Sequence, residues 1–321
     1  MSMSDTQVVR AGRDARPVPP PTEMSFRPGE TAAEGILRMT QEQAGLVHWL
    51  LTTPDVDRDD AIHEARKAMK RTRSLLRLVR DEIGADVYAR ENGVYRDVAR
   101  MLSRIRISAV MTETFDKVRE RYPEAVADAD AAAIRRLLEE RHAAALAELE
   151  ASGVMAEAAG IIADARARLN SLPVRCDDFS YMGKGIQRVY RRGWRAMHRA
   201  EREPATTNYH EWRKRVKYLR DQVRVLAPIW PRPMQALYGE LDRLAGTLGF
   251  EHDLADLQDA FRGELDGEGL PVAHLLPLMD AYREELRQLA HALGERIYAE
   301  PARAFRRRLQ AYWQAEGRDR I

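Results

Sequence analysis

The amino-acid sequence carries the same pattern of histidine and basic residues twice, 147 positions apart. The first copy spans residues 63–77 and the second spans residues 210–224. In register, seven of the fifteen positions are identical, and all seven are charged residues or histidine. A duplication kept only for packing would tend to preserve the apolar positions instead. The repeat therefore predicts two equivalent helices and a polyanion site.

Each copy is predicted to form a helix with one cationic face. At 100° per residue, the histidine and basic residues of a copy fall within about 80° of one direction. These residues are His63, Arg66, Lys67, Lys70, Arg73 and Arg77 in the first copy, and His210, Arg213, Lys214, Lys217, Arg220 and Arg224 in the second. The opposite faces are mostly apolar. A cation on every turn, about 5 Å apart along the helix, suits a linear chain of closely spaced anions.

The alternative is an ordinary solvated helix face, which usually mixes acids and bases three or four residues apart. Two observations favour a site instead: the face occurs twice, and positive charge is concentrated around it. The formal net charge of the chain is only +2, but residues 61–77 carry +5 and residues 184–224 carry +9. Such concentration is typical of anion binding. A third basic row, on one predicted helix face, consists of Lys184, Arg188, Arg191, Arg192, Arg195 and Arg199, of which Lys184, Arg188, Arg191 and Arg195 are assigned to the site.

Helical periodicity runs through the chain from Thr31 onward, which predicts an all-α protein. Thr31 and Glu34 predict a capping box at the first helix. Helices are expected over 31–51, 58–83, 87–119, 123–151, 154–169, 180–202, 207–227, 234–249, 251–264, 271–293 and 300–315. Pro277 should kink or break its helix. The duplication divides the chain into two half-bundles, 31–170 and 180–315, and the Pro-rich residues 1–29 are expected to be a disordered tail.

Composition restricts the cellular setting. A lone cysteine, Cys176, excludes an internal disulfide framework and favours a reducing compartment. No apolar run approaches the ~20 residues that span a bilayer, and the N-terminal region lacks the apolar core of a secretory signal. We therefore expect a cytoplasmic protein.

The motifs resemble those of the CHAD domain, the conserved histidine α-helical domain. The resemblance covers about residues 31–315 and is most specific in the second half, at 190–193, 209–220, 228–231 and 248–254, with a further match at 305–313. It implies two four-helix bundles related by a pseudo-twofold axis, with a basic channel between them. It also implies binding of inorganic polyphosphate, and localisation to polyphosphate granules as in some members. One departure is in the first half, where the family's Arg-Asp pair is not intact because Ile107 and Ser108 follow Arg106.

Catalytic chemistry finds little support in the sequence. The His-Glu-x-x-His zinc motif fails because Lys67 and Lys214 stand where the second histidine would be. There is no phosphate-binding loop for nucleotides and no Glu-x-Glu-x-Lys motif of the triphosphatases that often accompany CHAD domains. Phosphoryl transfer normally needs carboxylates that hold metal ions. We expect binding without catalysis, with no catalytic residue, metal or cofactor.

Two other kinds of partner remain open. A nucleic-acid binder would use the same phosphate contacts, but single-strand binders interleave aromatic residues with basic ones, whereas Trp212 lies on the apolar face. A granule scaffold could instead recruit anionic proteins or membrane. Of the histidines, His63 and His210 are assigned to the site, His252 is expected to be structural beside Asp253, and packing or capping roles are expected for His48, His142, His274 and His291.

Overall fold

The computed structural model describes residues 17–175, 179–263 and 272–318, without the side chains of Arg104, Arg106 and Arg318. The all-α prediction is confirmed, since the described residues form helices and no strand. Cys176 and residues 1–16 lie outside the described part of the chain.

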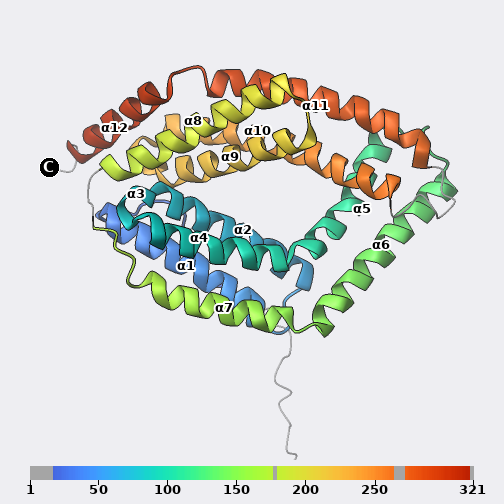
Figure 1. Cartoon of the computed structure of the whole chain (residues 1–321), viewed down its shortest axis with the longest axis horizontal. Coiled ribbons are helices and arrows are strands. Elements are labelled where there is room, and N and C mark those ends of the chain that lie inside the picture. Colours follow the sequence, from blue (N-terminus) through green and yellow to red (C-terminus); the bar gives the residue numbers. More distant parts are fainter. Residues whose placement is uncertain (1–16, 176–178, 264–271, 319–321) are drawn as a thin grey trace, which may run out of the picture.

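Each half of the sequence contributes a group of four packed helices (Figure 1). The first group is α1 (Ala32–Thr52), α2 (Arg58–Leu78), α4 (Ala85–Met101) and α7 (Val154–Leu169), with the short α3 (Arg80–Ile83) after α2. The second group is α8 (Ser180–Arg202), α9 (Thr206–Val225), α10 (Pro231–Arg262) and α11 (Leu275–Ile297), with the 3-10 turns Ala227–Ile229 and Val272–His274 before the last two. Helix α12 (Ala302–Arg318) packs along α8.

Two further helices of the first half, α5 (Ser103–Arg121) and α6 (Asp128–Ala151), extend toward the second half. They build a second apolar core together with the end of α10 and the start of α11. Phe115 of α5 meets Phe261 of α10 edge to face, with ring centroids 6.4 Å apart. The two sequence halves are therefore joined at this end as well as along α2 and α9.

Local sequence signals account for several helix ends. The predicted capping box is present: Glu34 N donates to Thr31 Oγ1 over 3.2 Å, and Thr31 N donates to Glu34 Oε2 over 2.9 Å. Pro277 neither kinks nor breaks α11, because it falls in the first turn of the helix, where no N–H donor is needed.

The division into helices differs from the prediction at three places. The helix expected over 58–83 ends at Leu78, and the one expected over 87–119 is divided at Leu102, which has φ −95° and ψ 13°. The two helices expected over 234–249 and 251–264 form the single helix α10, since Gly249 is tolerated within a packed helix. Hydrophobic periodicity does not reveal where a helix is interrupted, because packing against other helices determines the positions of such breaks.

The segment 17–29 packs on the protein instead of forming part of a disordered tail. Met24 and Phe26 are buried, and the Phe26 ring lies 5.7 Å from that of Trp313 in α12. Arg38 Nη1 donates to the Glu23 carbonyl over 3.1 Å. Two apolar side chains among many prolines were too weak a signal to predict this contact.

The two halves come into close contact where α8 passes the end of α2. A Cβ atom at Gly185 would lie 2.0 Å from the carbonyl oxygen of Leu78. Only glycine leaves room for this crossing, which brings the three basic rows into one region of the molecule.

Candidate anion-binding site

The two cationic helices of the repeat contact each other directly. Ser74 Oγ of α2 donates to the Tyr218 carbonyl of α9 over 3.1 Å, and Gln222 Nε2 of α9 donates to the Ser74 carbonyl over 3.2 Å. Ser74 and Gln222 are both buried. Because Ser74 lies in the middle of the first cationic face, part of that face packs on α9 instead of being fully solvated.

Arg77 shows how tightly the first basic row approaches α9. Its guanidinium lies 4.0 Å from the centre of the Tyr218 ring, a cation–π contact. Its Nη1 also donates to the Arg73 carbonyl over 2.8 Å. Burial lowers the pKa of Arg77 below its ordinary value.

Lys217 lies at the electrostatic centre of the contact. Its pKa is well below the usual value, first because burial penalises the ammonium group and then because Arg213 and Lys70 are close. Lys70 belongs to α2, so cations of both copies act on the same half-buried amine. Lys217 forms no ion pair with any carboxylate in the described parts of the chain. A positive group held in this way is stabilised by an anion more strongly than a solvated lysine is.

Other cations of the two rows form ion pairs with carboxylates, and one of these ion pairs is the same in both copies. Lys67 Nζ lies 2.7 Å from Glu64 Oε1, and Lys214 Nζ lies 2.5 Å from Glu211 Oε2. The glutamate of the repeat therefore neutralises the lysine three residues later in both copies. The sequence shows this glutamate in both copies, but the pairing depends on side-chain conformation and could not be predicted from it.

Two further cations of α2, Arg66 and Arg73, bind α4. Arg66 Nη1 donates to the Ala99 carbonyl, and Arg73 Nε donates to Asn92 Oδ1 over 3.2 Å. These bonds orient the two guanidinium groups.

The cations of α9 pair with carboxylates of α9 itself and of α10. Arg220 pairs with Asp221 and Asp242, with 2.9 Å between the closest nitrogen and oxygen in each pair. Arg213 Nη2 lies 4.0 Å from Asp253 Oδ1. Arg224 is exposed at the end of its row.

The third basic row lies along an exposed face of α8. Lys184, Arg191 and Arg195 are exposed, whereas Arg188 pairs with Asp81, just beyond α2. The pKa of the neighbouring Arg192 is lowered by burial and by Arg215 of α9. The row thus borders the α2–α9 contact but is more accessible than the two repeat rows.

His210 has a partner that sequence reasoning did not assign to the site. Its Nδ1 lies 3.1 Å from Nε2 of His252, which in turn lies 3.6 Å from Asp256 Oδ2. Burial and nearby cations lower the pKa of His210 to about 4 and that of His252 to about 3. Burial raises the pKa of Asp256 to about 6. The only signal for this pair was the motif around Asp253, since 42 residues separate the two histidines.

His63, the first-copy histidine, has a different setting. Its Nε2 lies 3.9 Å from Glu64 Oε1, and its side chain keeps 35% of its exposure. The two histidines of the repeat are therefore equivalent in sequence but not in environment.

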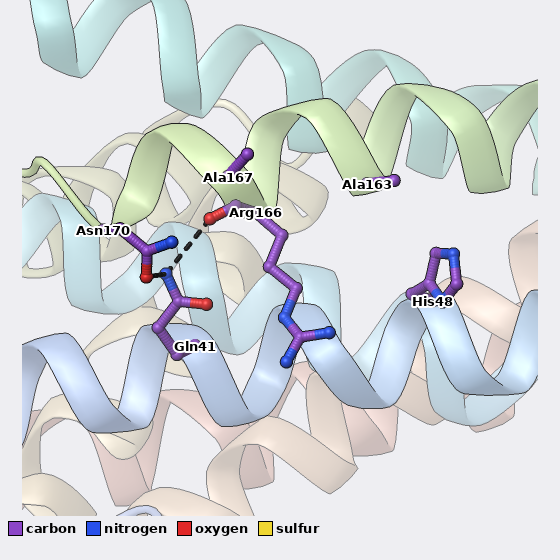
Figure 2. A pocket seen from close by; sticks show the side chains of 6 residues that line it. All are labelled: Gln41, His48, Ala163, Arg166, Ala167 and Asn170. Atoms are coloured by element: carbon purple, nitrogen blue, oxygen red, sulfur yellow. Dashed lines mark hydrogen bonds between the residues drawn. The ribbon is translucent and has the colours of Figure 1, made fainter.

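A separate groove of about 300 Å³ lies between α1 and α7, away from the basic rows (Figure 2). Gln41 Nε2 donates there to Asn170 Oδ1 over 2.9 Å and to the Arg166 carbonyl over 3.1 Å. Arg166 and His48 also line it, and Arg166 is exposed. One exposed arginine makes this groove a poorer anion site than the α2–α9 contact.

In residues 17–175, 179–263 and 272–318, no group of three or more histidine, cysteine, aspartate or glutamate side chains could hold a metal ion. No helix there combines the length and apolar character needed to cross a membrane.

Comparison with known proteins identifies the family. A search of curated proteins found no match. The family described as the CHAD domain matches residues 41–262 of the 321, which include both copies of the repeat, α8 and the His252 motif. The match covers more than half of the chain, and the chain belongs to the CHAD domain family.

Proposed function

We propose that the protein binds inorganic polyphosphate along the contact between α2 and α9, with the α8 row extending the surface. The observation that carries the proposal is the position of Lys217 on the α2–α9 contact, a half-buried amine beside Arg213 of its own helix and Lys70 of the other copy. Family membership supports the same ligand class. A linear polyanion would contact cations of both copies at once and relieve their mutual repulsion.

We further propose that the protein binds this ligand without transforming it. The glutamates nearest the two repeat histidines, Glu64 and Glu211, are engaged by Lys67 and Lys214. Phosphoryl transfer generally relies on carboxylates that hold metal ions close to the reacting phosphate. Here the carboxylates orient and neutralise cations instead, an arrangement that suits retention of a bound chain.

Affinity measurements across a salt series test the ligand. Long-chain polyphosphate, single-stranded DNA, single-stranded RNA and orthophosphate would be compared at matched salt. Polyphosphate should bind most tightly, and its affinity should fall steeply with salt because counterions are released. Equal or tighter binding of either nucleic acid would contradict the proposal. Nucleic acid is the weaker candidate because bases stack on accessible aromatic rings, whereas the Tyr218 ring at the contact is buried and faces Arg77.

Such binding would bring a cytoplasmic protein to polyphosphate granules. Fluorescently tagged protein should concentrate on granules, and a Lys70→Gln, Lys217→Gln double variant should be dispersed. A variant that stays on granules while losing affinity in solution would instead indicate recruitment through another partner, as expected of a scaffold.

A further inference from the structure

The register of the repeat extends beyond the two cationic rows. Asp59 and Thr206 are also 147 positions apart, and each lies four residues before the histidine of its copy. They fall in the first turns of α2 and α9. In each half, this position is bound by a side chain from a helix outside the repeat.

In the first half, that side chain is His142 of α6. Its Nε2 lies 2.6 Å from Asp59 Oδ2, and its Nδ1 lies 2.9 Å from Ser108 Oγ of α5. The His142 side chain is 19% exposed, so the contact is partly screened from water. The start of α2 is thereby tied to both α5 and α6.

In the second half, the equivalent position is bound by Arg283 of α11. Its Nη2 donates to Thr206 Oγ1 over 2.8 Å and to Glu251 Oε1 over 2.9 Å, and its Nη1 donates to Gln258 Oε1 over 2.8 Å. Glu251 is 1% exposed and directly precedes His252. This network ties the start of α9 to α10 and α11.

The chain of Ser108, His142 and Asp59 has the order of a nucleophile, a base and an orienting acid. The surroundings of these three residues favour a structural link between helices instead. Ser108 lies inside α5 and donates to the Ile105 carbonyl over 2.9 Å. In the equivalent network of the second half, the middle residue is Arg283, which cannot act as a base. The two networks differ in chemistry, but both attach the first turn of a repeat helix to neighbouring helices. This shared attachment is the best explanation of why both halves have one.

We infer that His142 is a positioning residue for the first cationic row: by tying the first turn of α2 to α5 and α6, it holds His63, Arg66 and Lys67 in place for the polyanion. This inference rests on the proposed function. It adds a residue that lies outside the repeat and whose second-half counterpart is an arginine. Preorganising side chains in this way favours binding, because less freedom is lost when the ligand arrives.

The test compares His142→Ala with His142→Arg, using long-chain polyphosphate as the probe. The alanine variant should lose roughly threefold to tenfold in affinity, the effect of leaving about one side chain to be ordered on binding. The arginine variant should regain most of that loss, since it can pair with Asp59 as Arg283 bonds to Thr206. His48→Ala, in the groove of Figure 2, is the matched control and should bind as the wild type does.

A double-mutant cycle separates positioning from general destabilisation. His142→Ala should be non-additive with Arg66→Gln, in the row that it positions, and additive with Lys217→Gln in the other row. If His142→Ala does not fold, Asp59→Ala and Asp59→Asn take its place, and only the asparagine variant should keep wild-type affinity. Unchanged affinity in folded variants, or additivity with Arg66→Gln, would overturn the inference. Failure of the wild type to bind polyphosphate would instead overturn the proposed function.

Discussion

At the scale of single residues, the pairing of His210 with His252 is the feature with the clearest chemical consequence. Their pKa values of about 4 and about 3 keep both rings neutral at pH 7. Each neutral ring carries one N–H group. One ring can therefore donate its proton to the unprotonated nitrogen of the other across the 3.1 Å contact. The pair is a neutral element at the edge of a strongly positive surface.

Polyphosphate binding should therefore take up protons. A bound polyanion reverses the local potential and raises the pKa of both rings, so affinity should strengthen as pH falls from 7 to 5. Calorimetry in buffers of different ionisation enthalpy would count the protons. A His210→Gln, His252→Gln variant should take up fewer, and equal uptake by this variant and the wild type would assign the protons to other groups.

The ligand-free protein should lose stability over the same pH range. A histidine whose pKa is lowered by folding binds its proton more readily when unfolded, so stability falls as pH drops from about 6.5 toward 4, by on the order of 1 kcal/mol per pH unit for each ring. Asp256, with a pKa raised to about 6, acts in the opposite direction and offsets about one ring. Denaturant unfolding at pH 7 and pH 5 should show a net loss that is smaller in the double histidine variant. His48→Gln is the control, and a loss that is the same in every variant would contradict this assignment.

At the scale of helices, α2 and α9 act as two copies of one element that meet at Ser74, Tyr218 and Gln222. The repeat was sufficient to predict which helices carry the cations and which faces they occupy. It could not predict that Ser74 would be buried or that Arg77 would lie over Tyr218, because both depend on how two distant helices cross. Likewise, His252 was missed because its partner is remote in sequence, and its own helix was expected to begin only at residue 251.

Matched substitutions in the two helices test whether both rows serve one site. Lys70→Gln and Lys217→Gln should each weaken polyphosphate binding, by on the order of 1–3 kcal/mol if charge-assisted bonds are lost. Lys117→Gln removes a lysine that pairs with Glu113 on α5 and should have little effect. Loss of affinity only in Lys217→Gln would make the first row an ordinary solvated face.

The crossing of α8 over α2 should be sensitive to a single methyl group. Gly185→Ala places a carbon against the Leu78 carbonyl, and overpacking of this kind typically costs about 1–3 kcal/mol. Gly239→Ala is the matched control in α10, where a Cβ would meet nothing within 4 Å. That variant should be neutral or slightly stabilising. Denaturant midpoints would compare the two, and equal stability would show that the helices can move apart at the crossing.

At the scale of the whole molecule, the duplicated halves are not independent units. The second apolar core combines Phe115 and Ile134 of the first half with Phe261 and Met279 of the second. Arg121 and Glu285 pair across the same junction, 3.1 Å apart. The duplication identifies two halves in the sequence. Hydrophobic periodicity could not predict the contacts between them, because it does not show which helices pack against each other.

Residues 31–170 produced alone should therefore fold incompletely. The fragment would expose the apolar faces of α5 and α6 that α10 and α11 cover in the full chain. Light scattering and binding of a hydrophobic dye should show association, and co-expression with residues 180–315 should reduce it. A monomeric fragment with cooperative unfolding would show that the first half folds by itself.

The same junction can form only late in the synthesis of the chain. Residue 115 leaves the ribosome long before residue 261, its aromatic partner, has been added to the chain. At typical rates of about 5–20 residues per second, the wait is on the order of ten to thirty seconds. During that time α5 and α6 form an apolar arm with nothing to cover it, so the nascent chain depends on dilution or on a chaperone until α10 and α11 arrive.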